Sequence, residues 1–310
     1  MGPPASHQFV SHRHFALPVA VGLLGITFFS TMDAVMKGLS LAIGAYNAML
    51  WRVIIGVPLT GLLYAASSAW GRLPRPSRAA MRLHVVRGIV GALMAVAFFW
   101  GLVRMPLAEA IALSFIAPLI ALYLAALLLG ERIGRRAILA SLLGFAGMLL
   151  ILAAKAGAPP EQRNWAAVLA ILGSAVLYAY NIVLMRQQAQ VADPLEVAFF
   201  QNLTVGVALG LFAPLLAVVP PAGLLPGLLA AALLASASLL LLAWAYRRAE
   251  AQRLVPVEYS ALIWAALYGA LFFDEPLQLA TVAGAALIVG GCLLAARAQR
   301  QPVSTAEAAL

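Results

Sequence analysis

Charge is what this sequence has least of. Only 10 % of its 310 residues are charged and 64 % are hydrophobic, whereas a typical soluble domain is about 25 % charged and about 45–50 % apolar. A water-soluble globule of this composition could not cover its own surface with polar groups. The scarcity of charge therefore excludes an ordinary soluble protein and predicts a membrane protein.

Cysteine and histidine are also scarce. Cys292 is the only cysteine, which excludes a disulfide or a cysteine-based metal site within one chain. The four histidines, His7, His12, His14 and His84, lie outside the long apolar runs or at the edge of one. Because intramembrane zinc peptidases and serine proteases need histidine deep in a span, an enzyme is disfavoured. We expect no metal and no cofactor.

Lysine occurs only as Lys37 and Lys155, so the net charge of +9 rests almost wholly on arginine. Neither lysine belongs to the Gly-Lys-Ser/Thr sequence of a phosphate-binding loop, which disfavours an ATP-driven pump. Most arginines lie in short clusters between apolar runs, as the positive-inside rule predicts for membrane loops. The basic charge is therefore a topology signal, and we expect no nucleic-acid partner.

Charge-poor windows of about 20 residues, the length of a membrane-crossing helix, recur along the whole chain. Residues 197–246 carry no charge, and Pro220, Pro221 and Pro226 divide this run into two spans. The sequence predicts an all-α membrane protein of ten transmembrane helices, at 15–36, 43–66, 84–103, 107–129, 137–154, 165–185, 195–219, 224–246, 254–273 and 276–296.

The basic residues also predict an orientation. With a cytoplasmic N-terminus, 14 of the 20 fall in cytoplasmic segments, two fall within spans, and four lie on the opposite side, namely Lys37, Arg104, Lys155 and Arg163. Such a bias in short loops predicts cytoplasmic tails at 1–14 and 297–310. No loop is long enough for a soluble domain, so the function must reside among the helices.

Two segments that lie 144 positions apart are similar. Glu131 and Gly147 in the first half align without a gap with Glu275 and Gly291 in the second. Five spans in each half make the second half start on the opposite side of the membrane. Residues 15–154 and 165–296 are thus predicted to be inverted five-helix repeats, a plan that places the substrate site near the membrane midplane between them.

Two longer runs carry a family resemblance. The first half contains Pro106-Leu107-Ala108-Glu109-Ala110, Pro118 and Gly130-Glu131-Arg132, and the second contains Trp244-Ala245-Tyr246-Arg247-Arg248-Ala249, Glu258-Tyr259, Trp264 and Phe273-Asp274-Glu275-Pro276. They resemble the two repeats of the EamA-type drug/metabolite transporter superfamily, over residues 20–297. The resemblance implies a ten-helix exporter of small metabolites in a bacterial inner membrane. Family members include exporters of amino acids, one of them for aromatic amino acids, and exchangers of nucleotide sugars and sugar phosphates.

Charged residues within the spans are candidates for function because they are costly in a membrane. Arg52 could bind a substrate carboxylate or form a structural pair with Asp33, and Asp33 could instead be a proton-coupling carboxylate. Glu258 could line the cytoplasmic end of the transport path or lie at the interface. Since Arg52 is the only cation expected deep in a span, phosphorylated substrates are disfavoured and zwitterions or neutral amphiphiles are favoured.

Other charged residues lie near span ends and are expected to have structural roles. Glu131 and Glu275 are expected to pair with or cap helix ends. Interface anchoring is expected for four more residues: Arg87, Glu109, Asp193 and Glu196.

Polar and aromatic residues complete the candidate site. Ser174, Tyr178 and Asn181 follow one stripe of a helix, which faces either a cavity or another helix. Pro118 interrupts a span and is a candidate hinge. The predicted substrate-binding residues are Arg52, Phe99, Tyr123, Tyr178, Asn181, Trp244, Glu258 and Trp264.

Together these features predict a secondary transporter that exports small amphipathic metabolites, with amino acids, including aromatic ones, favoured. The expected partners are a small-molecule substrate and the lipid bilayer, and a monomer is compatible with this plan. Two alternatives use the same fold: a flippase for lipids or lysolipids, and an exchanger of sugar- or nucleoside-type metabolites.

Overall fold

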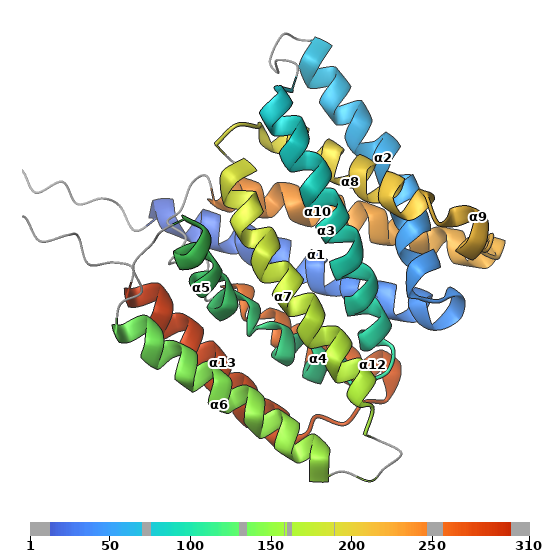
Figure 1. The fold of residues 1–310 in the computed structure, drawn as a ribbon. Coiled ribbons are helices and arrows are strands. Elements are labelled where there is room, and N and C mark those ends of the chain that lie inside the picture. Colours follow the sequence, from blue (N-terminus) through green and yellow to red (C-terminus); the bar gives the residue numbers. More distant parts are fainter. Residues whose placement is uncertain are drawn as a thin grey trace, which may run out of the picture.

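The computed structural model is a bundle of helices (Figure 1) that describes residues 13–69, 76–129, 135–157, 159, 163–188, 190–246 and 257–298. No strand occurs in these ranges. The elements are α1 (Arg13–Ile43), α2 (Ala45–Ala69), α3 (Arg78–Leu102), α4 (Leu107–Ser114), α5 (Ala117–Leu129), α6 (Arg135–Gly157), α7 (Trp165–Gln188), α8 (Pro194–Gly210), α9 (Ala213–Leu216), the 3₁₀ turn η2 (Ala222–Leu224), α10 (Leu225–Tyr246), α12 (Ala261–Phe273) and α13 (Leu279–Ala298).

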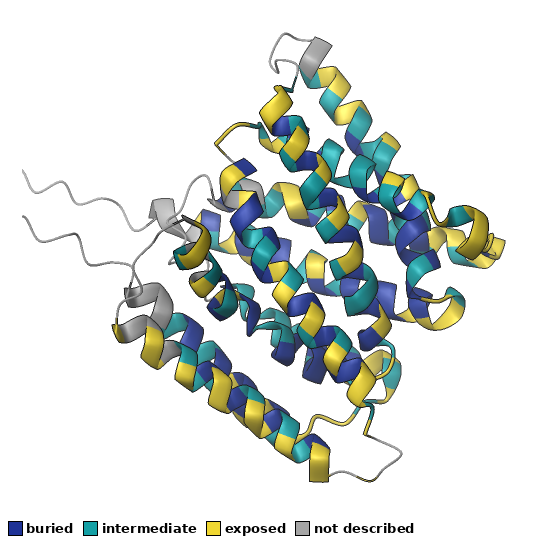
Figure 2. Ribbon diagram, in the orientation of Figure 1, coloured by how far each residue is buried: buried dark blue, intermediate teal, exposed yellow. Residues whose placement is uncertain are grey.

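Helices suit this composition because they satisfy their backbone hydrogen bonds internally, as a lipid environment requires. Six helical segments are long and apolar enough to cross a membrane, and three shorter apolar helices cover Ser141–Gly157, Ala261–Phe273 and Leu279–Leu294. Exposed residues lie along the outer faces of the helices (Figure 2), and large apolar ones are among them, such as Leu62, Leu127 and Ile263, each at least 70 % exposed. The chain is a multi-pass membrane protein, with six clear spans among the residues that the structure describes.

Two predicted spans end at other residues in the structure. The first helix does not end at residue 36 but continues to Ile43, because Lys37 is buried within it and paired. The predicted span 195–219 is a helix only to Gly210, followed by the four-residue α9. The predicted span 107–129 is recovered as one apolar stretch, Leu107–Leu128, although its helix is interrupted between α4 and α5. A hydropathy window averages over such pairings and turns, so it detects neither.

The division between α4 and α5 has a local cause. The amide of Phe115 donates to the carbonyls of Ile111 and Ala112, and the amide of Ile116 donates to Leu113, so the helix tightens and stops. The chain restarts at Ala117 with Pro118 in the second helical position, where a missing N–H costs nothing. The candidate hinge Pro118 thus stands directly after a break in the helix.

The helices pack in pairs that join the two halves of the chain. α1 lies along α10, α3 along α7, α2 along α8, α4 along α12 and α6 along α13, the last pair standing at one side of the bundle (Figure 1). α3 also contacts α8, α10 contacts α2, α5 contacts α7, and α12 contacts α1. Each helix of the first half has a counterpart in the second half: α1 corresponds to α7, α2 to α8, α3 to α10, α4 and α5 to α12, and α6 to α13. When every helix is exchanged for its counterpart, the same set of contacts results.

Candidate functional site

Arg52 is a cation with unused hydrogen-bonding capacity inside the bundle. It lies on α2, where one terminal nitrogen donates to the sulfur of Met49 at 3.2 Å, and thioether sulfur is a weak acceptor. Its Nε is buried and has no partner. Asp33 on α1, which is 4 % exposed, interacts with Arg52 electrostatically. These two described residues form no ion pair, so the alternative of a structural ion pair with Asp33 is not observed.

Asp33 lines a narrow pocket between the two halves of the chain. The pocket is formed by α1, α4 and α12, with Ser30, Asp33, Leu107, Ile111, Ala261 and Ala265 as its lining. The hydroxyl of Ser30 is buried and has no hydrogen-bond partner. One carboxylate and one unused hydroxyl therefore share a pocket to which both halves contribute.

Tyr178 on α7 has an unusual environment. Its hydroxyl interacts electrostatically with Glu258, Arg87 and Asp33, which belong to three other segments of the chain. Its side chain is nevertheless 45 % exposed. Tyr178 is therefore accessible and also within electrostatic range of charges from three other segments. Tyr178 thus lies within electrostatic range of two other predicted candidates, Asp33 and Glu258.

The other members of the polar stripe on α7 face α3. The hydroxyl of Ser174 donates to the carbonyl of Met94 at 2.9 Å, and the Asn181 side-chain oxygen accepts from Arg87 Nε at 3.2 Å. Of the two predicted surroundings, another helix is the one observed for these two residues. Tyr178 lies between them and is more exposed.

The predicted aromatic residues are dispersed. Trp264 stacks on Tyr268 with ring centroids 5.7 Å apart, and the Tyr268 hydroxyl bonds to Thr31 at 2.8 Å, next to Ser30. This places Trp264 on the helix that lines the Asp33 pocket. Phe99 is buried in the core, Tyr123 on α5 is 38 % exposed, and Trp244 lies half-buried on α10.

Most of the expected interface anchors are instead buried between helices. Glu109 and Glu196 are 2 % and 3 % exposed, and Arg87 bonds to two side chains of α7. Asp193 does lie at a helix end, where it accepts from the Leu195 amide at 3.1 Å and caps α8. The position of a residue near the end of a span does not tell whether its side chain faces lipid or a neighbouring helix. Only the second orientation buries the side chain inside the protein.

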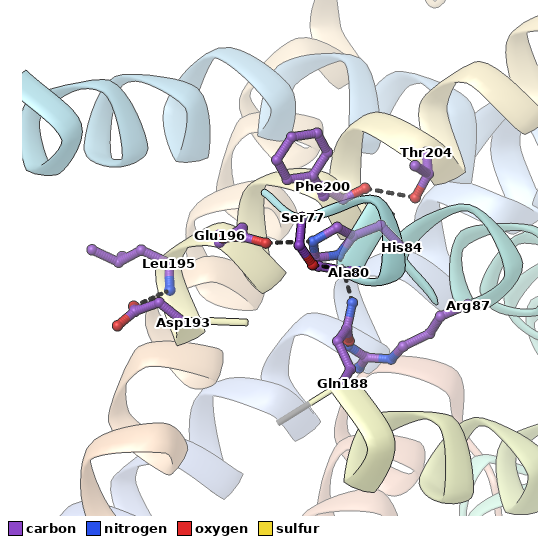
Figure 3. A network of polar contacts seen from close by, with 10 residues as sticks. All are labelled: Ser77, Ala80, His84, Arg87, Gln188, Asp193, Leu195, Glu196, Phe200 and Thr204. Atoms are coloured by element: carbon purple, nitrogen blue, oxygen red, sulfur yellow. Dashed lines mark hydrogen bonds and ion pairs between the residues drawn. The ribbon is translucent and has the colours of Figure 1, made fainter. Parts of the chain in front are cut away.

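We define the His84 cluster as His84, Arg87, Asn181, Gln188 and Glu196, and Figure 3 draws all of them except Asn181. His84 Nε2 lies 2.8 Å from Glu196 Oε1, and His84 Nδ1 lies 2.5 Å from Gln188 Nε2. Arg87 donates to Gln188 Oε1 at 2.5 Å. The ring of His84 also stacks on Phe200 at 4.7 Å. Sequence reasoning placed His84 at a span edge, whereas the structure buries it completely.

We define the Glu275 cluster as Lys37, Glu275 and the backbone amide of Leu107. Lys37 pairs with Glu275 and donates to the Met105 carbonyl at 2.9 Å. Glu275 also accepts from the amide of Leu107, the first residue of α4, at 2.7 Å, which confirms its predicted capping and pairing role. Lys155 donates to Glu109 at 3.2 Å. The aligned Glu131 lies outside the described residues.

Arg52 is not the only cation that lies among the helices. Lys37 and Lys155 are 2 % and 8 % exposed within helices, and Arg87 reaches between α3 and α7. The two lysines are paired with carboxylates, and Arg87 donates to two amide oxygens. Among these four cations, Arg52 alone bonds only to a sulfur atom.

Comparisons with known proteins agree with this architecture. The model of the EamA-like transporter family matches residues 16–153 and again residues 165–297. The chain is 29 % identical to a pseudopaline exporter of Pseudomonas aeruginosa, over 91 % of this chain and 96 % of the relative. It is also 29 % identical to a riboflavin transporter of Rhizobium johnstonii, over 89 % of each chain.

Two further relatives extend the comparison. An uncharacterized transporter of Helicobacter pylori is 28 % identical, over 90 % of this chain and 94 % of the relative. A solved crystal structure with 23 % identity superimposes with a TM-score of 0.62, over 92 % of this chain and 99 % of the other, and so shares the fold. The two family matches, which together span nearly the whole chain, show that it belongs to the EamA-like transporter family of the drug/metabolite transporter superfamily.

Proposed function

We propose that this transporter exports small amphipathic metabolites that carry a carboxylate, foremost amino acids including aromatic ones. The observation that carries the proposal is Arg52, a cation within the bundle whose Nε is buried without a partner. A buried guanidinium is costly unless an anion or hydrogen-bond acceptor satisfies it. A substrate carboxylate would supply the strong hydrogen-bond acceptor that the sulfur of Met49 does not provide.

The surroundings of Arg52 support a zwitterionic substrate with an apolar part. Asp33 provides negative charge, and the unpartnered Ser30 hydroxyl lies in the same pocket. Trp264 and Tyr268 offer aromatic surface on the helix that lines this pocket. We assign Arg52 to the carboxylate and Trp264 to the apolar part. Asp33 is the candidate proton-coupling group.

We further propose that the remaining predicted residues line the path at different depths: Phe99, Tyr123, Tyr178, Asn181, Trp244 and Glu258. Pro118 would act as a hinge, and its place directly after the break between α4 and α5 supports that role. A helix that is already interrupted can bend there at little cost.

The transport cycle that we propose is alternating access between two inverted five-helix repeats in the bacterial inner membrane, with both termini cytoplasmic. The two separate family matches and the helix contacts that persist when the halves are exchanged support the repeats. The arginine distribution supports the orientation. The relative named as an exporter favours outward transport.

The test is transport by purified protein in liposomes loaded with radiolabelled phenylalanine, tryptophan or threonine. We expect efflux to be faster than from protein-free vesicles loaded in the same way. Arg52→Ala should lower the transport rate about tenfold or more, because a charged hydrogen bond to the substrate is removed. Trp264→Ala should lower the rate for phenylalanine and tryptophan more than for threonine. The matched control is Arg104→Ala, since Arg104 is exposed, covers the ring of Trp100 and donates to the Trp100 carbonyl at 2.7 Å, away from the candidate site.

If no amino acid leaves faster than from protein-free vesicles, the amino-acid proposal is wrong, and a panel of sugars, nucleosides and lysolipids separates the exchanger from the flippase. If Arg52→Ala and Trp264→Ala both transport like the parent, the site assignment is wrong. Size-exclusion profiles and thermal unfolding of each variant separate lost transport from lost folding.

A further inference from the structure

Two polar clusters tie the halves of the chain together at opposite ends of the bundle. His84 lies in the second turn of α3, and Lys37 of the Glu275 cluster bonds to Met105, just after α3 ends at Leu102. The 18 residues from His84 to Leu102 correspond to about 27 Å along the helix. The clusters therefore stand nearly one membrane thickness apart.

The candidate substrate site lies between these clusters. On α7, Tyr178 precedes Gln188 of the His84 cluster by about 15 Å of helix, and on α1, Asp33 precedes Lys37 of the Glu275 cluster by about 6 Å. Each cluster thus stands between the site and one end of the bundle.

The His84 cluster joins the halves through a fully determined set of hydrogen bonds. Arg87 can only donate, so the Gln188 oxygen must face it and the Gln188 amide nitrogen must face His84 Nδ1. This leaves the ring proton on Nε2, from which it is donated to Glu196; the assignment follows from the network. His84 and Arg87 belong to the first half, and Asn181, Gln188 and Glu196 belong to the second.

The Glu275 cluster joins the halves through a single residue. Glu275, between α12 and α13, accepts from Lys37 of α1 and from the amide that begins α4. Both donors belong to the first half. The Lys155–Glu109 pair connects α6 with α4, which are both in the first half, so it does not bridge the two repeats.

We propose that these clusters are the two gates of the transporter, an inference that rests on the proposed alternating access. When one half rocks against the other, the contacts between the halves must break in one cluster while those in the other cluster stay formed. In the proposed orientation, opening the His84 cluster exposes the site to the cytoplasm, and opening Glu275 from Lys37 and Leu107 exposes it to the opposite side. His84, Gln188, Glu196, Lys37 and Glu275 are therefore positioning residues, which set the populations of the two open states without touching substrate.

The test measures from which side the site can be reached. A reporter, Tyr178→Cys, is introduced into a Cys292→Ser background, since Cys292 is the only native cysteine. Labelling rates with a membrane-impermeant maleimide are then compared in right-side-out and inside-out vesicles. The readout needs no substrate, so it is independent of which metabolite is carried.

Gln188→Leu should raise labelling from the cytoplasmic side about threefold or more and lower it from the opposite side, because two cross-half hydrogen bonds are lost. Glu275→Gln should shift labelling in the opposite direction. The variant that combines both substitutions should return toward the parent ratio. Glu196→Gln and Lys37→Gln provide a second variant for each cluster if either first variant fails to fold.

Glu109→Gln is the matched control because it breaks a buried ion pair within one half. It should lower the unfolding temperature without changing the ratio of labelling rates. If folded variants of both clusters leave the ratio unchanged, or shift it toward the same side, the gate proposal is wrong. If the parent is labelled from one side only, alternating access itself fails, which overturns the proposed function rather than the assignment of gates alone.

Discussion

At the scale of single residues, some charged side chains that the sequence places near span ends are buried and paired in the structure. Glu109 and Lys155 are each expected at an interface or a loop, yet both are buried and bonded to each other. The second oxygen of Glu109 is buried without a partner, so this pair is only partly compensated. Removing one member of a buried pair leaves an uncompensated charge, which costs more than removing both.

We therefore expect Glu109→Ala to be strongly destabilising, by about 3–5 kcal/mol. The double variant Glu109→Gln/Lys155→Met should regain most of this loss, because no unpaired charge remains. Thermal unfolding of the purified protein in detergent provides the comparison. A double variant no more stable than Glu109→Ala would show that the ion pair does not account for the effect.

At the scale of helices, small residues decide how closely elements approach. A Cβ atom placed on Gly147 of α6 would lie 2.4 Å from the Gly284 carbonyl oxygen, and one on Gly284 would lie 2.6 Å from the Gly147 carbonyl oxygen. Both distances are too short for any side chain. α6 and α13 thus cross backbone to backbone, as small residues allow in membrane helices.

Gly284→Ala should force α6 and α13 apart and destabilise the protein by about 1–3 kcal/mol, the usual range for overpacking. The control is Gly173→Ala on α7, where a Cβ meets no atom within 4 Å and alanine should stabilise the helix by about 0.5–1 kcal/mol. Thermal unfolding of both variants under one condition is decisive: equal shifts in the two would contradict the close crossing.

At the scale of the whole molecule, neither half has a core of its own. α1 packs along α10 and α3 along α7, so helices of the first half bury their faces against helices of the second. The two matches of the family model end and begin near the connection between α6 and α7. The break between repeats in sequence is therefore not a break between independently folded bodies.

This arrangement predicts that a chain divided after Pro159 reassembles only when both pieces are made together. The fragments 1–159 and 160–310 should co-purify through a tag on either one, whereas each expressed alone should be degraded or aggregate. Size-exclusion chromatography after affinity capture is the measurement. A first fragment that purifies alone as a folded monomer would contradict the mutual packing.

The sequence alone determined the class of the protein, because membrane solvation acts on composition and not on detailed geometry. Low charge, recurring apolar windows and the two similar runs were enough to predict an all-helical membrane transporter of the EamA type, and the family was confirmed. The same information predicted that Glu275 pairs with or caps a helix end, since a carboxylate next to an apolar span must find a donor.

Only the tertiary structure decided which charges are satisfied and by which partners. Lys37 and Glu275 are 238 positions apart and His84 and Glu196 are 112 positions apart, so no local pattern relates them. Whether a charge near a span end faces lipid or a neighbouring helix depends on how the halves pack. In the structure Lys37 and Lys155 are paired with carboxylates, whereas Arg52 Nε has no partner. The sequence indicated Arg52 by its position within a span, and the structure indicates it by this missing partner.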